Sequence, residues 1–125
     1  MTRSERTGVA TLMKSLLLAF AIFAVSPAAS AEIIGAWKIH GSVFFNAVDT
    51  TCHFKADGPG VVATCEYYGK LENFTQATIA GNKVGWSWDA HQAVLAFQGT
   101  LTSDTAMKGE IIVRGFTGSF TATKQ

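Results

Sequence analysis

Two cysteines flank a strong turn signal, and this pattern constrains the fold more than any other feature. Cys52 and Cys65 are the only cysteines of the chain, and residues 57–60 (DGPG) lie midway between them. Gly and Pro beside an Asp are typical of a tight turn. If residues 57–60 form the loop of a hairpin, Phe54 faces Ala63 and Cys52 faces Cys65, with both sulfurs on one side.

This register predicts a structural disulfide. Opposed residues of an antiparallel pair have Cα atoms about 4.5–5.5 Å apart, which a disulfide accepts. The bridge would close a loop of about 14 residues, worth about 3 kcal/mol in the chain-entropy model. A metal site would need more ligands, and His53 points to the opposite face from Cys52 because side chains alternate along a strand. We therefore predict no metal; a labile redox pair is the remaining alternative.

The start of the chain has the pattern of a secretory signal peptide. Lys14 precedes an apolar run over residues 16–25, and Ala29-Ser30-Ala31 follows. This order is typical of signal peptides, and the run is shorter than the roughly 20 residues of a membrane span. We expect cleavage after Ala31.

The domain boundaries follow from that cleavage. Residues 1–31 would be removed, and residues 32–125 would form a single domain without a membrane span. Either Met1 or Met13 could be the true start. We expect a periplasmic or secreted bacterial protein, whose oxidising surroundings suit a disulfide.

The mature chain shows alternating apolar residues throughout and no helical period. Tight turns separate short segments, which is typical of an all-β fold. The predicted strands cover residues 35–45, 50–56, 61–68, 71–80, 83–89, 93–101, 106–114 and 119–123. Eight such strands predict an eight-stranded antiparallel up-and-down meander β-barrel in which the last strand closes on the first.

One further turn fixes a register. Gly81-Asn82 is a two-residue hairpin signal. It places Ile79 opposite Val84, and by continuation Ala77 opposite Trp86 and Thr75 opposite Trp88.

Several short motifs resemble the calycins, the superfamily of lipocalins and avidins. The first strand opens with G-x-W at residues 35–37, and F-x-G-x-L, M-x-G-x-I and G-x-F-x-A follow at residues 97–101, 107–111 and 118–122. This set resembles small exported bacterial lipocalin-like proteins. GNKVGWSW followed by AFQGTL is similar to the middle of an avidin, but no Trp follows Trp88 to close a biotin pocket. The resemblance implies a barrel that can hold a small ligand.

Strand parity predicts which residues face the barrel interior: Trp37, Ile39, Phe45, Phe54, Tyr67, Ile79, Trp86, Trp88, Leu95, Phe97, Met107, Ile111 and Phe120. An eight-stranded barrel is either filled by side chains or holds one small ligand. Trp86 and Trp88 could equally be core or pocket wall. For a small hydrophobic or aromatic ligand, we predict contacts from Trp86, Trp88, Tyr67, Phe54, Phe97, Asn73 and Thr75.

An enzyme is the alternative from another functional class. His91 shares parity with Leu95 and lies at a turn, so it could sit at one mouth of the barrel or be an exposed loop residue. With Tyr67 it could move a proton in a cofactor-free isomerase, cyclase or lyase. No paired carboxylates, P-loop or nucleophile motif is present in the sequence.

The charge and the outward-facing aromatic residues indicate which macromolecular partners to expect. The mature chain has eight acidic and seven basic side chains without a basic stripe, so nucleic acid is not an expected partner. Phe44, Phe74 and Tyr68 have outward parity. If they cluster, the protein could act through its surface as a structural or inhibitory module with a filled barrel. Outward aromatics also allow a homodimer.

Overall fold

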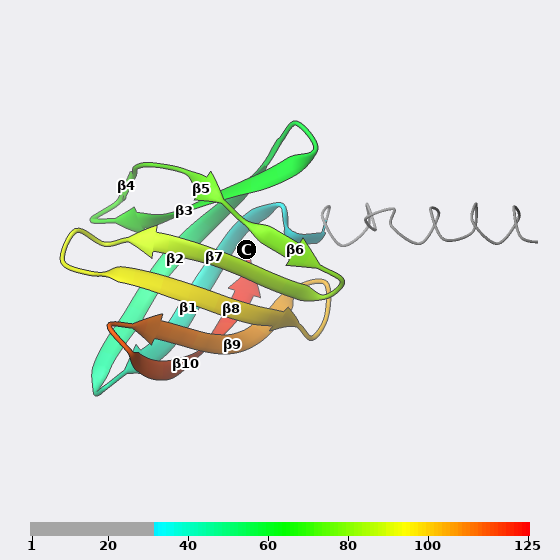
Figure 1. Cartoon of the computed structure of the whole chain (residues 1–125). Coiled ribbons are helices and arrows are strands. Elements are labelled where there is room, and N and C mark those ends of the chain that lie inside the picture. Colours follow the sequence, from blue (N-terminus) through cyan, green and yellow to red (C-terminus); the bar gives the residue numbers. More distant parts are fainter. Residues whose placement is uncertain (1–31) are drawn as a thin grey trace, which may run out of the picture.

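The structure is a computed structural model and describes residues 32–125. It is all-β and antiparallel (Figure 1). The predicted signal peptide lies outside the described residues. The strands are β1 (Gly35–Val43), β2 (Asn46–Asp57), β3 (Gly60–Tyr67), β4 (Lys70–Leu71), β5 (Thr75–Gln76), β6 (Thr78–Ala80), β7 (Lys83–Asp89), β8 (Val94–Leu101), β9 (Ala106–Val113) and β10 (Phe116–Lys124).

Most of the predicted meander is present. Consecutive long strands pair as hairpins, and β10 pairs with β1, so the expected contact of the last strand with the first is confirmed. The sheet order is β4-β3-β2-β1-β10-β9-β8-β7-β6, with β5 on β3. The predicted register of the first hairpin is confirmed at Cys52 with Cys65, and that of the second at Ile79 with Val84.

The number of strands and the closure differ from the prediction. The strand expected over residues 71–80 is split into β4, β5 and β6, which gives ten strands instead of eight. β5 pairs only with β3, and β6 pairs only with β7, so the hydrogen-bonded sheet is not closed. We call this interruption, residues 72–80 between β3 and β7, the seam.

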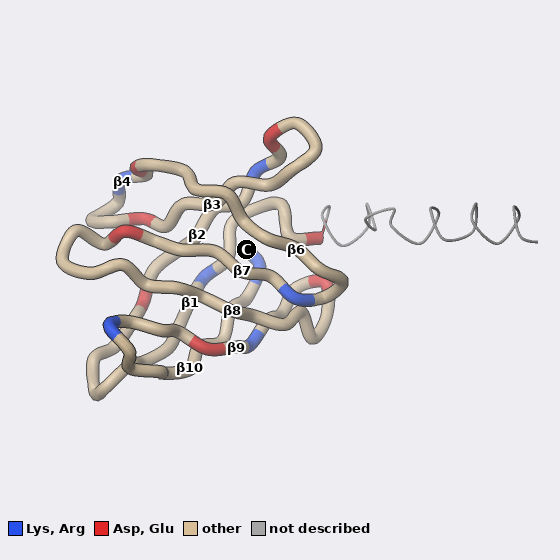
Figure 2. Tube along the Cα trace, viewed as in Figure 1, with Lys and Arg blue, Asp and Glu red and all other residues tan. Residues whose placement is uncertain are grey.

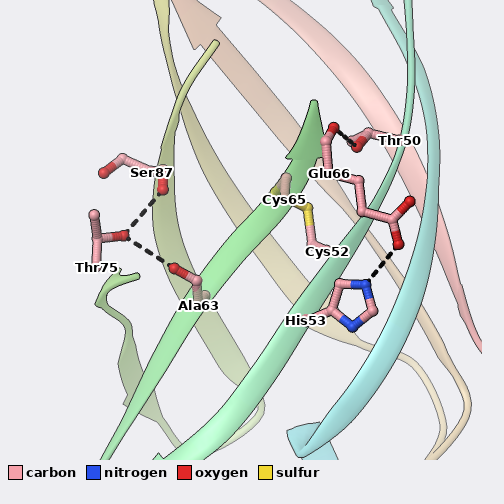
Figure 3. Close-up of a disulfide and its surroundings, with 8 residues drawn as sticks. All are labelled: Thr50, Cys52, His53, Ala63, Cys65, Glu66, Thr75 and Ser87. Carbon is pink, nitrogen blue, oxygen red and sulfur yellow. Dashed lines mark hydrogen bonds and ion pairs between the residues drawn. A yellow bond between two sulfur atoms is a disulfide. The ribbon is translucent and has the colours of Figure 1, made fainter. Parts of the chain in front are cut away.

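A side chain links the two sides of the seam. Thr75 pairs with Ala63 rather than with Trp88, which corrects the predicted register. Its hydroxyl Oγ1 lies 3.4 Å from the carbonyl oxygen of Ala63 and 3.1 Å from that of Ser87, on either side of it (Figure 3). Thr75 therefore takes part in holding β3 and β7 together where no backbone ladder spans them.

The disulfide is confirmed. Cys52 and Cys65 are bonded to each other, with their Cα atoms 3.9 Å apart and both side chains buried. Figure 3 shows the bridge between β2 and β3. His53 is on the other face of β2, where its Nε2 lies 2.7 Å from an oxygen of Glu66.

Aromatic rings fill the middle of the barrel. Trp86 stacks on Phe97 with centroids 4.8 Å apart and meets Phe54 edge-on at 4.9 Å and Phe120 at 5.8 Å. The side chain of Met107 occupies the space beside Gly99, because a Cβ on Gly99 would lie only 2.5 Å from Sδ of Met107. These contacts pack the centre of the barrel with buried side chains.

The end of the barrel beside the N-terminal segment is also filled. Ile33 is fully buried, and the indole Nε1 of Trp37 donates a hydrogen bond to its carbonyl oxygen at 2.9 Å. Most of the predicted inward residues are buried, and Tyr67, Ile79 and Trp88 are partly so. Phe45 is the exception: β1 ends at Val43, and Phe45 is 99% exposed in the following turn. Its predicted inward position was wrong because the strand ends before reaching it.

Candidate functional site

An open pocket lies at the opposite end of the barrel. Four chain reversals meet at this end, on the left of Figure 1: β1–β2, β3–β4, β7–β8 and β9–β10. The pocket has a volume of about 590 Å³, which is within the range of small-molecule sites. Its aromatic walls are Phe44, Tyr67, Tyr68, Trp88 and Phe116. We call it the end pocket.

The aromatic side chains of the end pocket contact one another in pairs. The rings of Phe44 and Phe116 are 4.5 Å apart, and those of Tyr67 and Tyr68 are 4.6 Å apart and edge-on. Trp88 is partly buried between them and the core. Leu95 and Val113 add aliphatic surface to the lining. The pocket is therefore mainly apolar, with aromatic groups placed at its mouth.

The turns around the end pocket carry backbone strain. Within residues 32–125, every non-glycine residue with a positive φ lies in them: Phe44 (50°), Phe45 (69°), Tyr68 (51°), His91 (68°) and Arg114 (50°). Each costs about 1–2 kcal/mol relative to an ordinary backbone conformation. At the other end of the barrel, the turns place Gly58 and Gly81 at positive φ, where no such cost arises. Strain gathered at one end of a fold points to a function there.

Replacing Phe45 with Gly should stabilise the protein by about 1 kcal/mol. Relief of strain at φ 69° contributes about 1–2 kcal/mol, and the extra freedom of the unfolded chain offsets about 0.5 kcal/mol. The ring is 99% exposed, so little packing is lost. Phe45→Ala is the matched control, since it removes the same ring but keeps a Cβ. Urea unfolding should show no stabilisation for Ala; equal values for the two variants would contradict the strain.

A histidine and a carboxylate lie at the rim. His91 is in the β7–β8 turn, where its backbone N–H donates to Oδ1 of Asp89 at 2.9 Å. Its Nε2 contacts a carboxylate oxygen of Glu72, and its ring centroid is 4.6 Å from that of Tyr67. His91 is exposed, as one of the two sequence alternatives predicted, and Tyr67 connects it to the pocket wall.

The structure separates the predicted ligand-binding residues into three groups. Tyr67 and Trp88 line the end pocket. Asn73 is exposed in the loop between β4 and β5, and Thr75 holds the seam. The other three, Phe54, Trp86 and Phe97, pack on one another in the core.

Other residues of the site were missed at the level of sequence. Arg114 and Phe116 line the end pocket, but Arg114 was predicted at the end of the strand over residues 106–114 and Phe116 in the turn after it, both without a role. Phe44 and Tyr68 are exposed, as predicted, but they also line the pocket, which was not predicted. Aromatic residues in turns, where Asn and Gly are usual, were the available signal. Phe74 does not line the end pocket; its ring lies 4.2 Å from the ammonium of Lys55.

A second hollow of about 630 Å³ lies on the outer face of β6–β9. Short or polar side chains such as Thr78, Ser87 and Gln98 line it. The larger apolar residues of its lining, Val84, Trp86 and Phe97, are buried in the core, whereas several aromatic side chains of the end pocket are accessible, so the end pocket is the better candidate. Over residues 32–125, no three potential metal ligands are grouped and no helix has the length and apolarity to cross a membrane.

Comparison with known proteins gives a likeness of fold. No family model and no curated protein matches the chain. Of three solved structures that resemble it, two are redesigned β-barrels. A redesigned β-barrel named b11L5F_LGL has a TM-score of 0.61 at 18% identity and covers 78% of this chain and 95% of its own. EF1p2_mFAP2b bound to DFHBI has a TM-score of 0.58 at 16% identity, covering 78% and 97%. The redesigned β-barrel mFAP1, also bound to DFHBI, has a TM-score of 0.55 at 15% identity, covering 78% and 98%. At such low identity the likeness shows the fold alone: the chain is a β-barrel.

Proposed function

We propose that this protein is an exported, lipocalin-like barrel that binds a small hydrophobic or aromatic molecule in the end pocket. The observation that carries the proposal is the position of the aromatic side chains. Tyr67, Trp88 and Phe116 surround a pocket of about 590 Å³ at the one end of the barrel that the core does not fill. The strained turns at the same end support it, since a backbone cost persists where a function needs it. Two barrels of similar fold hold the small molecule DFHBI.

Export is part of the proposal. The signal-peptide pattern of residues 12–31 and the buried Cys52–Cys65 disulfide both suit an oxidising compartment. The natural ligand would then be captured outside the cytoplasm. Mass spectrometry of the small molecules released on denaturing the natively exported protein tests whether it carries such a ligand. A stoichiometric apolar compound is the expected result.

Binding by the end pocket can be tested with N-phenyl-1-naphthylamine, a neutral aromatic probe that fluoresces in apolar sites. Trp88→Ala should weaken its binding about tenfold, because an aromatic wall contributes about 1.5 kcal/mol through buried area. Trp86→Phe is the matched control. It changes an indole that is buried outside the pocket lining and whose Nε1 has no hydrogen-bond partner, so the probe should bind as to the wild type. Equal affinities for Trp88→Ala and the wild type would refute the site.

An enzyme is the second candidate, and one observation favours it. The contact of His91 with Glu72, beside Tyr67 on the pocket wall, could move a proton on a bound substrate. In that case His91→Gln would leave probe affinity unchanged and abolish conversion of the compound identified by mass spectrometry. Conversion at the wild-type rate would exclude this role for His91.

A further inference from the structure

Arg114 gives the end pocket a chemical preference. It is the one cationic side chain that lines the pocket within the described part of the chain. It lies in the β9–β10 turn, where Figure 2 shows a blue, cationic segment. Its Nη2 donates a hydrogen bond of 2.5 Å to the carbonyl oxygen of Gln92 in the β7–β8 turn. This contact fixes the position of the guanidinium across the mouth.

The carboxylate that lines the end pocket is engaged by a histidine. Asp49, the acidic residue of the pocket lining, lies 2.5 Å from Nδ1 of His40. Two further carboxylates also contact histidines: Glu66 contacts His53, and Glu72 contacts His91. Among residues 32–125, no carboxylate lies within ion-pair distance of Arg114. The guanidinium has five N–H donors, and the single bond to Gln92 leaves others free for a ligand.

The backbone at Arg114 points to a role for its side chain. Its φ is 50°, and Gly115 follows at 83°. Asn or Gly would occupy the first position of such a turn with less strain. A long cationic side chain is therefore kept at a cost in stability, next to an aromatic pocket.

We propose that the end pocket takes an amphipathic acid: a flat apolar body between the aromatic walls, with an anionic group held by Arg114. A guanidinium is planar and binds carboxylate, sulfonate or phosphate oxygens through paired hydrogen bonds. Phe116 and Trp88 would contact the apolar body of the same molecule. This inference rests on the proposed function, and adds the charge of the ligand to it.

A pair of probes separates charge from shape. 1-Anilinonaphthalene-8-sulfonate and N-phenyl-1-naphthylamine share the same aromatic skeleton, but only the first carries an anion. Arg114→Gln should weaken sulfonate binding about tenfold or more, because a charge-assisted hydrogen bond contributes about 1.5–3 kcal/mol. Binding of the neutral probe should change less than about twofold. Arg114→Lys should give an intermediate loss for the sulfonate, since it retains the charge without the planar fork.

Lys108→Gln is the control for net charge. Lys108 is exposed on β9 and does not line the pocket, so its loss should leave both probes unaffected. Unchanged sulfonate binding in Arg114→Gln, or an equal loss for both probes, would overturn the anionic preference while leaving the pocket intact. If the wild type binds neither probe, the proposed function fails, and this inference fails with it. Near-ultraviolet circular dichroism verifies that each variant is folded.

Discussion

Replacing Trp86 with Ala should lower the free energy of unfolding by about 3–5 kcal/mol, the range for an aromatic residue removed from a packed core. Trp86 is 4% exposed and contacts Phe54, Phe97 and Phe120 from three different strands. Urea unfolding followed by circular dichroism measures the loss.

The same variant separates the core from the site. Because Trp86 does not line the end pocket, the folded fraction of Trp86→Ala should bind the neutral naphthylamine probe with nearly wild-type affinity. Trp88→Ala should show the reverse, a loss of binding with a smaller loss of stability, since its side chain is only partly buried. A loss of stability below about 1 kcal/mol in Trp86→Ala would mean that the core is not packed as described.

Removing the disulfide should cost about 3 kcal/mol, the value expected for a closed loop of about 14 residues. The sequence separation of the two cysteines is 13. Cys52→Ala combined with Cys65→Ala removes the cross-link, and denaturant unfolding of this variant should match that of the reduced wild type. The loss of stability should be largest at the seam, because β3 has only the short strands β4 and β5 on the side away from β2.

Hydrogen exchange can locate that effect. Amides of β3 and β5 should lose protection in the double variant before those of β9 and β10, which pair along their whole length. Equal stability of the double variant and the oxidised wild type would rule out a stabilising role for the bridge.

The first hairpin shows how far local rules reach. Residues 57–60 determine where the chain turns, and the turn determines that Cys52 meets Cys65. The pairing of Ile79 with Val84 follows in the same way from Gly81-Asn82. Both registers depend on neighbouring residues alone, so the sequence was sufficient to predict them.

The seam shows where local rules stop. Residues 71–80 have the alternation of one strand, yet Thr75 pairs with β3 and Ile79 with β7. Which partner each half takes depends on how the two distant strands approach each other around the barrel. The prediction that Phe45 faces inward was wrong for a related reason. Its parity would be correct in a longer strand, but the chain reverses at Phe44.

By itself, the sequence determined the all-β fold, the main hairpins, the disulfide and the inward face of most strands, because turn chemistry and alternation act over a few residues. Only the tertiary structure decided which inward residues fill the barrel and which surround a pocket. Trp86 and Trp88 share one face of β7, but Trp86 is level with Phe97 in the core and Trp88 with Leu95 in the pocket lining. Parity gives the face on which a side chain lies and carries no information on its depth along the barrel axis. That depth depends on the packing of all the strands together.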